Sequence, residues 1–289
     1  MEFTRNLKKG MSGEDVRAVK ERLVTLGYLY AATKLTFGSD TLKAVKAFQA
    51  ANGLETDGVV GILTLSALFN DDVDKPTVEA EIVPERFSPA ARMAIGTALA
   101  QVSDIRREIC LDALQFAVEA EEKPASMLAF YIRGGNMYNK DLTLNVMTES
   151  KLKAYFAKDS YAPYFDGGRD DLMMETAMRS MFQCPGWDCS GMIVGLMRKH
   201  GIYDSGFDAN ANTLGASHTV RTDNPQAGDW ACKSGHIGLY VGGGYAVESV
   251  GGAFGVQLTK IKKRLVYDFQ YKKLRNYGTW EYFGDPKRY

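Results

Sequence analysis

The sequence carries no net charge, because 35 lysines and arginines balance 35 aspartates and glutamates among its 289 residues. Without a global electrostatic field, the chain has no general attraction for nucleic acid. It also lacks an apolar run long enough to cross a bilayer, so we expect no membrane insertion. With 45% hydrophobic residues, the chain has enough material for one large domain or two modest ones.

Cysteine and histidine are both scarce, with four and three residues. The cysteines are too scattered for a disulfide scaffold or for the ligand spacing of a zinc site: Cys110, Cys184, Cys189 and Cys232. We therefore expect free thiols, no bound metal and no other cofactor. The scarcity also narrows the search for catalytic residues, because a reactive thiolate needs a base and the chain offers His200, His218 and His236.

One cysteine, Cys189, stands at the predicted start of a helix. Asp188 before it is a common helix cap, and the residues after it are apolar at helical spacing: Met192, Ile193, Leu196 and Met197. A sulfur at a helix N-terminus faces unpaired N–H groups and the positive end of the helix dipole, which favour the thiolate. A buried, inert cysteine is the alternative and the commoner case. Because the small neighbours Ser190 and Gly191 leave room for a substrate, we interpret Cys189 as a nucleophile.

His236 is the best candidate for the base. It opens a strand pattern, Ile237–Val241, directly after a short turn. His200 is expected at the far end of the Cys189 helix, too distant at a rise of about 1.5 Å per residue. His218 lies in a polar segment without periodicity, which is typical of a loop.

A third candidate, Glu248, depends on the register of a predicted β-hairpin. Three glycines separate the first strand from a second strand pattern, Tyr245–Val250. If all three form the loop, Val241 pairs with Tyr245, and His236 and Glu248 project from the same face of the hairpin. The carboxylate could then orient the imidazole and favour its protonated form. A two-residue loop would reverse the faces, which leaves a solvated Glu248 as an equal alternative.

These segments resemble the successive motifs of NlpC-type cell-wall cysteine peptidases and of the related CHAP amidases and peptidases. The resemblance is carried by Asp188-Cys189-Ser190-Gly191, Ala227-Gly228-Asp229-Trp230 and His236-Ile237-Gly238-Leu239-Tyr240-Val241-Gly242. It implies an α+β, papain-like catalytic domain, in which the helix bearing the cysteine packs on a small antiparallel sheet. It also implies catalysis by Cys189, His236 and Glu248 on amide bonds of peptidoglycan. A glutamate in the third position is more like the CHAP pattern, so the subfamily stays open.

The family pattern also places a Tyr-x-x-Gly-Gly segment before the nucleophile, and Tyr131 to Gly135 match it. The resemblance implies that Tyr131 lies near the oxyanion site. Asp188 could pair with a free amine of the substrate, and Ser190 beside the nucleophile is a further substrate-binding candidate. In the family the two motifs follow closely, whereas here an insertion around residues 137–183 intervenes. We expect either a groove wall or lid beside the site, or a simple packing excursion.

Residues 1–70 are predicted to form a small domain of three helices. Ser12 is expected to cap the first helix, Thr41 to begin the second, and the third to cover Thr64–Leu68. This segment resembles the peptidoglycan-binding module of wall hydrolases through Gly10, Gly13, Leu26-Gly27-Tyr28, Phe37-Gly38, Ala44-Val45-Lys46-Ala47-Phe48-Gln49 and Asp57-Gly58-Val59-Val60-Gly61. The resemblance implies a wall-targeting role without catalysis, in which the apolar residues form the core.

The remaining segments complete the domain plan. Residues 71–86 are acidic and punctuated by proline, which indicates a linker, and residues 87–289 form the expected catalytic domain. Within it, Ser88 and Pro89 start a helix and Ile105–Glu122 continues as an amphipathic helix. Strands are predicted over Gly255–Lys260 and Tyr267–Leu274, with a basic cluster expected on solvated faces: Lys260, Lys262, Lys263, Arg264, Lys272, Lys273 and Arg275.

We therefore expect an endolysin-like peptidoglycan hydrolase, a monomer that cleaves stem-peptide amides, preferably the γ-D-glutamyl bond to the diamino acid. An N-acetylmuramoyl-L-alanine amidase of CHAP type and a catalytically inactive wall-binding or phage structural protein are the alternatives. No apolar segment follows Met1 to Arg5, so no signal peptide is recognised. A protein that waits in the cytoplasm for release to the wall, as phage lysins do, fits this feature, as does a trimmed mature form.

Overall fold

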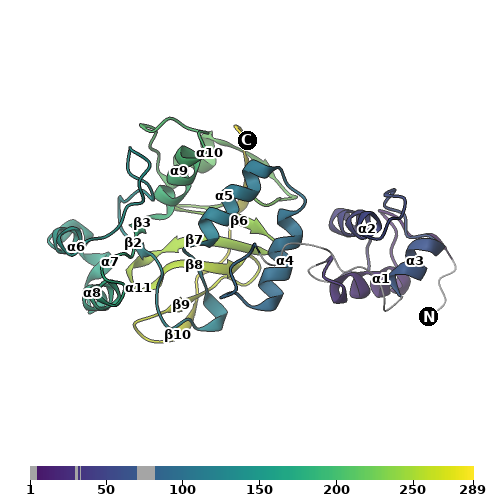
Figure 1. Cartoon of the computed structure of the whole chain (residues 1–289), viewed down its shortest axis with the longest axis horizontal. Helices are drawn as coiled ribbons and strands as arrows, with labels where there is room; N and C mark the ends of the chain where they lie inside the picture. The colour runs from purple at the N-terminus through teal and green to yellow at the C-terminus, as the bar shows by residue number, and fades with distance from the viewer. Residues whose placement is uncertain (1–4, 30–31, 33, 70–81) are drawn as a thin grey trace.

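The computed structural model describes residues 5–29, 32, 34–69 and 82–289. These residues form a small helical unit and a larger unit of helices around a sheet (Figure 1). Residues 71–81, most of the linker predicted over 71–86, lie outside the described residues. The described end of the linker, residues 82–86, belongs to the larger unit, because Val83 is fully buried in the main hydrophobic core of that unit.

The first unit contains α1 (Glu14–Thr25), α2 (Ser39–Ala51) and α3 (Ile62–Leu68) in its described part. Their apolar faces share one core with Leu7, Phe37 and Val60, and include Val16, Val19, Leu23, Val45, Phe48 and Leu68. Full burial of each such side chain stabilises the fold by roughly 1.5–3 kcal/mol.

The predicted starts of these helices are wrong by a few residues. Each helix follows a glycine in the N-cap position, and none of the three caps makes a side-chain hydrogen bond. Ser12 does not cap α1, because its hydroxyl donates to Thr36 at 3.1 Å instead. Thr41 and Thr64 both lie inside helices that have already begun. Glycine is tolerated at an N-cap, so these starts carry little signal in the sequence.

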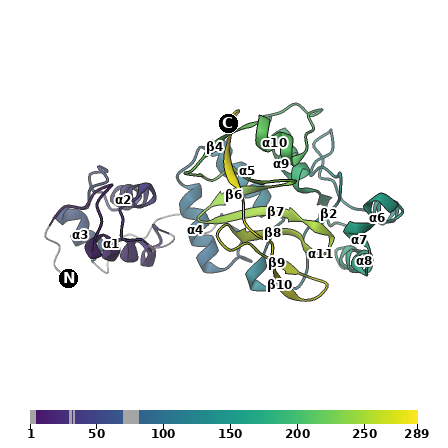
Figure 2. The ribbon, with the colours of Figure 1, turned by 180° about the vertical axis from the view of Figure 1, so that it is seen from behind.

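The larger unit is built on a sheet that has seven strands among the residues described. In spatial order they are β1 (Val118–Glu119), β8 (Gly255–Lys260), β7 (Tyr245–Val250), β6 (His236–Gly242), β5 (Trp230–Lys233), β11 (Tyr282–Pro286) and β4 (Thr219–Thr222). Only β1 and β8 pair in parallel within this sheet as described. The C-terminal strand, yellow in Figure 2, lies at the same edge as β4. The strands predicted from 236, 245 and 255 onward are confirmed.

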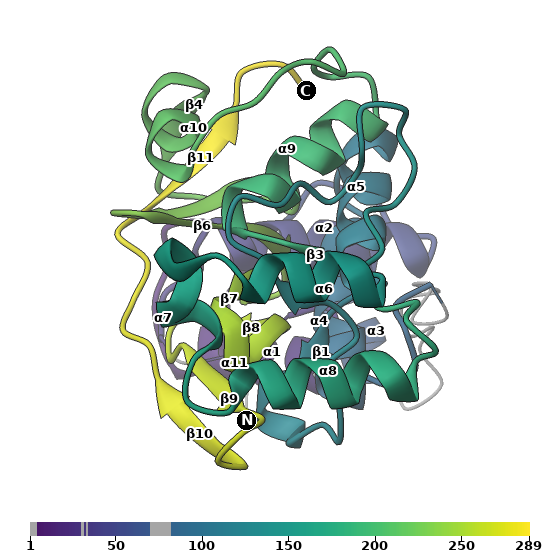
Figure 3. The same ribbon diagram turned by 90° about the vertical axis from the view of Figure 1, so that its left-hand side faces the viewer.

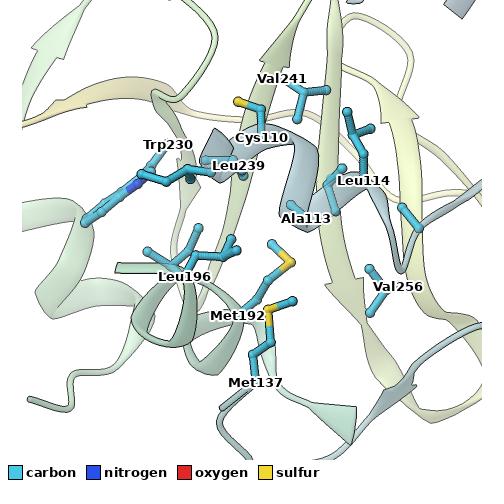
Figure 4. Close-up of a cluster of buried hydrophobic side chains, with 14 of the residues drawn as sticks. Cys110, Ala113, Leu114, Met137, Met192, Leu196, Trp230, Leu239, Val241 and Val256 are labelled. Carbon is cyan, nitrogen blue, oxygen red and sulfur yellow. The ribbon is translucent and has the colours of Figure 1, made fainter. Parts of the chain in front are cut away.

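Helices cover one face of the sheet and form the main core with it. They are α4 (Pro89–Leu99), α5 (Asp104–Leu114), α9 (Cys189–Lys199) and α10 (Ala211–Ser217). Figure 4 shows Met192 and Leu196 of α9 in one cluster with side chains of β6 such as Leu239, and all three are fully buried. As predicted, Ser88 caps α4, and its hydroxyl accepts a hydrogen bond from the N–H of Ala91 at 3.3 Å.

Two predicted elements of this unit are wrong in extent. The helix expected over Ile105–Glu122 ends at Leu114, and the residues after it form β1 and the 3₁₀ helix η1 (Ala120–Glu122). Pairing of Val118 with Gln257 at the sheet edge overrides the helical periodicity there. The strand expected over Tyr267–Leu274 is a separate hairpin of β9 (Leu265–Asp268) and β10 (Lys273–Asn276). Asp268 stabilises its turn by accepting backbone hydrogen bonds from residues 270 and 271, each at 3.1 Å.

The insertion between the two family-like motifs folds into a helical subdomain (Figure 3). It contains α6 (Glu149–Phe156), η2 (Asp159–Tyr161), α7 (Ala162–Phe165) and α8 (Arg169–Arg179). These helices share a second buried core with side chains from outside the insertion, among them Phe130 and Phe269. The subdomain also contacts α11 (Gly251–Phe254), which directly follows β7. The insertion therefore packs against the elements that carry the site.

The separate cores predict that the larger unit folds without the first. The two units share a 2.8 Å hydrogen bond from the Thr97 hydroxyl to the Gly27 carbonyl, worth about 1 kcal/mol. A fragment of residues 82–289, which keeps the buried Val83, should therefore unfold cooperatively within about 2–4 °C of the larger unit in the full chain. Calorimetry of both proteins checks this expectation. A fragment without a cooperative transition would show that the larger unit needs the first.

Candidate active site

The start of α9 is fixed by the carboxylate of Asp188. Its Oδ1 accepts hydrogen bonds from the Gly191 N–H at 2.8 Å and the Ser190 hydroxyl at 2.9 Å, and its Oδ2 accepts one from the Gly134 N–H at 2.8 Å. Cys189 is therefore the first helical residue, and it is 7% exposed. Asp188 and Ser190 thus shape the position of the thiol, and contact between either of them and a substrate stays a prediction.

The Tyr-x-x-Gly-Gly segment lies directly beside this helix start. Strand β2 (Phe130–Tyr131) pairs in parallel with β3 (Gly186–Trp187), and the Asp188 N–H donates to the Gly135 carbonyl at 3.0 Å. Gly191 permits this approach, because a Cβ on it would lie 1.9 Å from the same carbonyl oxygen. The motifs that the insertion separates in sequence are therefore neighbours in space.

Tyr131 lies on the wall of the site, next to the insertion. Its ring stacks on Tyr164 of α7, with 5.4 Å between ring centroids and an interplanar angle of 23°. The guanidinium of Arg133, an exposed residue, lies 5.3 Å from the centroid of the Tyr164 ring. Burial, and then the nearby Cys189, raise the pKa of the Tyr131 phenol, so this hydroxyl stays protonated and able to donate. The insertion thus supplies an aromatic side chain to the surroundings of Cys189.

The hairpin that carries His236, the candidate base, differs from the predicted hairpin in its loop and in its register. Tyr245 pairs with Gly242, so the predicted pairing with Val241 is wrong and the loop holds two residues. A register shift between Tyr240 and Gly242 inserts one extra residue into β6, and this bulge reverses the faces a second time. His236 and Glu248 consequently face each other, with 2.8 Å between Nε2 and Oε2.

Glu248 is a buried carboxylate with several donors. It has no exposed surface, which excludes the solvated alternative. Its oxygens accept hydrogen bonds from His236, from the Thr259 hydroxyl at 2.6 Å, and from the Arg264 Nε at 2.9 and 3.0 Å. Burial alone would raise the pKa of Glu248, but the hydrogen bonds from His236 and Arg264 lower it to about 2. The group is therefore an anion throughout the physiological pH range.

His236 lies between this carboxylate and the thiol. Burial alone would lower its pKa, but hydrogen bonds to Cys189 and then Glu248 raise the pKa of His236 to about 9. The ring also stacks on Trp280, at 5.4 Å between centroids and 10° between planes. The structure thus brings Cys189, His236 and Glu248 into one hydrogen-bonded series, in which a protonated imidazole can accompany a thiolate.

Three residues at this site were not predicted from the sequence: Thr259, Arg264 and Trp280. Arg264 was expected on a solvated face with its basic neighbours, and that expectation is wrong, because the side chain is 2% exposed. No local pattern distinguishes Arg264 from the lysines around it. The distinguishing contact is with Glu248, which is distant in sequence.

The other two histidines have partners elsewhere. His200 follows α9 and lies 2.6 Å from Asp112 through its Nε2. His218 follows α10, where a loop was predicted, and its Nδ1 lies 2.9 Å from the Tyr203 hydroxyl. Neither is placed at Cys189, so His236 remains the candidate base.

All four cysteines lie in the described segments and are free thiols. Burial raises the pKa of Cys110, raises that of Cys184 to about 12 and raises that of Cys232 to about 11. These three are therefore poor nucleophiles at neutral pH. Within the same segments, no group of three or more His, Cys, Asp or Glu side chains is placed to hold a metal ion. No helix there is long and apolar enough to cross a bilayer.

Comparison with known proteins shows a relationship to the cell wall in the first unit. Residues 12–68 match the family described as "Putative peptidoglycan binding domain". The chain is 40% identical over 65 residues to the N-acetylmuramoyl-L-alanine amidase CwlL of Bacillus licheniformis, which covers 22% of this chain and 18% of that protein. It is 32% identical over 127 residues to the protein disulfide isomerase pTAC5 of Arabidopsis thaliana, which covers 43% of this chain and 33% of that protein. The chain thus spans a third or less of either relative.

The paired His236 predicts a reactivity difference among the thiols. At neutral pH, iodoacetamide should label Cys189 well before Cys110, Cys184 and Cys232, because these three are buried thiols with raised pKa values. Mass spectrometry of the digested protein measures each site, and labelling after unfolding provides the control. Equal, slow labelling of all four in the folded protein would contradict the paired thiol.

Proposed function

We propose that this protein is a peptidoglycan hydrolase that cleaves an amide bond through Cys189. The observation that carries the proposal is the series Cys189, His236 and Glu248 at a helix start, in a chain that also has a peptidoglycan-binding domain. The helix on an antiparallel sheet, with the thiol on one and the base on the other, supports a papain-like catalytic domain. The amidase named among the relatives supports the same substrate class.

Each residue has a defined part in the proposed reaction. The Cys189 thiolate attacks the amide carbon, a C–S bond forms, and the carbonyl electrons move to the oxygen. The N–H groups at the start of α9 and the Tyr131 phenol are the donors proposed for this oxyanion. His236 then gives its proton to the leaving nitrogen as the C–N bond breaks.

The second half of the reaction returns the enzyme to its starting state. His236, now neutral, removes a proton from water, and the resulting hydroxide attacks the thioester carbon. The C–S bond breaks, the carboxylic acid product leaves, and the thiolate and imidazolium form again. Glu248 stays ionised throughout and holds the imidazole by its hydrogen bond to Nε2.

We propose the γ-D-glutamyl bond to the diamino acid as the bond that is cleaved. The contiguous NlpC-like motifs support this choice, and the exposed Arg133 over Tyr164 supplies a cation suited to a stem-peptide carboxylate. The second candidate is the amide between muramic acid and L-Ala. Glu248 in the third position and the similarity to an amidase support it, although the latter covers 22% of the chain.

The other relative is named for disulfide exchange, and the thiols here favour hydrolysis instead. Exchange through a pair of thiols within this chain would need a second accessible thiol beside Cys189. Cys110, Cys184 and Cys232 are each buried, and each has a raised pKa.

The roles proposed for Cys189 and His236 predict that replacing either residue abolishes activity but leaves the fold intact. Cys189→Ala and His236→Ala should each lower the rate of sacculus lysis by at least about 10³-fold, because each removes a group that acts in the chemical step. Both variants should still bind sacculi through the first unit. Turbidity measures lysis, sedimentation with sacculi measures binding, and circular dichroism checks the fold. Cys184→Ala, a buried thiol away from the pair, is the control, and lysis by either site variant would refute the assignment.

The products distinguish the two candidate bonds. Digestion of purified sacculi should release peptides whose new amino terminus belongs to the diamino acid, because the thiolate is proposed to attack the γ-carbonyl of D-glutamate. Mass spectrometry of the soluble products identifies that terminus. A new L-Ala amine together with free lactyl-muramic acid would instead establish the amidase.

A further inference from the structure

Arg264 makes the most extensive contact with the buried carboxylate. It stands at the base of the β9–β10 hairpin, where the Tyr277 N–H donates to its carbonyl at 3.0 Å. Its Nε donates to Glu248 at 2.9 and 3.0 Å, and its Nη2 also donates to Glu248. Its Nη1 donates to the Tyr277 carbonyl at 2.7 Å. The guanidinium is thus held at two points, which fixes the position of the carboxylate.

Trp280 connects the same guanidinium to the base. Its ring is stacked on His236, and the Cζ of Arg264 lies 4.5 Å from the ring centroid. The ring fits there because β6 has Gly238 at this point, where a Cβ would lie 3.0 Å from Trp280. The indole N–H has no hydrogen-bond partner among the described residues, so stacking determines the ring orientation.

We propose that Arg264 is a positioning residue of the reaction, which acts through Glu248 to keep His236 protonated beside Cys189, with Trp280 fixing the plane of the imidazole. The inference rests on the proposed function of Cys189 and His236. A carboxylate without exposure to water would tend to take up a proton, and a neutral acid gives an imidazolium no electrostatic support. Arg264 prevents that protonation.

The charged groups around Glu248 and His236 support an action of Arg264 on His236 through Glu248. Around Glu248 lie His236 from β6 and Arg264 from the loop after β8. The pKa of the Tyr277 phenol is raised mainly by burial, and Glu248 adds to that rise. Farther out, Asp268 of β9 and Arg169 of α8 also act on Tyr277. Asp268 is itself paired with Arg275 at 2.8 Å. Beside His236, Cys189 of α9 is the other titratable partner.

A merely structural alternative would also explain a buried arginine. Buried ion pairs, however, are weak contributors to stability, because desolvation offsets their attraction. The two roles differ in what they change. A structural role affects unfolding, whereas the proposed role affects the pH range over which the thiolate and imidazolium coexist.

The test compares Arg264→Met and Arg264→Lys with the wild type. Alkylation of Cys189 by iodoacetamide is measured at pH 6, below the His236 pKa of about 9, and at pH 10, above it. For Arg264→Met we expect a drop of up to about tenfold at pH 6, because a one-unit fall in the His236 pKa shifts the equilibrium between the thiolate–imidazolium and thiol–imidazole forms of the pair tenfold, and no change at pH 10. Arg264→Lys should show a smaller drop in the labelling rate, because lysine keeps the positive charge but loses the planar arrangement of donors of the guanidinium.

The pH profile of kcat/KM on a soluble stem peptide provides the second readout. Its basic limb should lie near the His236 pKa of about 9 in the wild type and about one unit lower in Arg264→Met. The His236 pKa is raised in the folded protein, so activity is present below that limb and lost as the pH rises through it. In a Glu248→Gln background, Arg264→Met should not move the limb further, because the carboxylate through which it acts is gone.

Arg275→Met is the matched control, since Arg275 belongs to the same basic cluster and pairs with Asp268 rather than Glu248. A folded Arg264→Met with the wild-type pH 6 rate and basic limb would overturn the inference, as would an equal shift in Arg275→Met. If Arg264→Met does not fold, Arg264→Lys with an unchanged profile overturns it. A wild-type Cys189 without reactivity at pH 6 would overturn the proposed function itself.

Discussion

A carboxylate without contact with water, that of Glu248, determines how this site is assembled. Its donors come from β6, from β8 and from the base of the β9–β10 hairpin. Removing one partner of a buried ion pair costs about 3–5 kcal/mol, because the other charge is left uncompensated. The sheet and the hairpin must therefore be in place together before the imidazole has its orientation, and folding and site formation are coupled.

The thiol is fixed by a different constraint, which is the close approach of two backbone segments. The Asp188 carboxylate joins the first turn of α9 to the Gly134 N–H, and the absence of a side chain on Gly191 lets the Gly135 carbonyl reach the helix. These contacts lie on the helical side, whereas the carboxylate network lies on the sheet. Cys189 and His236 meet where the two sides join, so each residue can be held rigidly by its own neighbours.

Local patterns predicted the parts of the site that depend on short-range physics. The helix start at Cys189 and the strand from His236 follow from capping residues and from alternation of apolar side chains. The β6–β7 hairpin shows where prediction from local patterns fails, because two errors cancelled. The loop is shorter than predicted, and the bulge at Val241 returns His236 and Glu248 to the same face of the hairpin. Three successive glycines carry no side-chain pattern from which either feature could be derived.

Long-range contacts explain what the sequence did not predict. Arg264 is surrounded by lysines and belongs to no periodic element, so only its distant partner makes it buried. Residues 118–119 follow a helical pattern smoothly, yet an edge position on the sheet takes them into β1. The helix starts of the first unit were also mispredicted, because a glycine in the N-cap position allows a helix to begin there but does not indicate that one begins.

The insertion between Gly135 and Trp187 leaves and rejoins the larger unit at a single point, since the backbone atoms on either side of it are hydrogen-bonded to each other. Closing a loop of twice the length between the same two ends costs only about 0.6 kcal/mol more, so a longer or shorter insertion mainly has to keep the core that it shares with Phe130 and Phe269. Its size is thus independent of the placement of the thiol. The proposed catalytic centre can therefore have different walls, and the range of substrates proposed for it would change through this segment while Cys189, His236 and Glu248 stay in place.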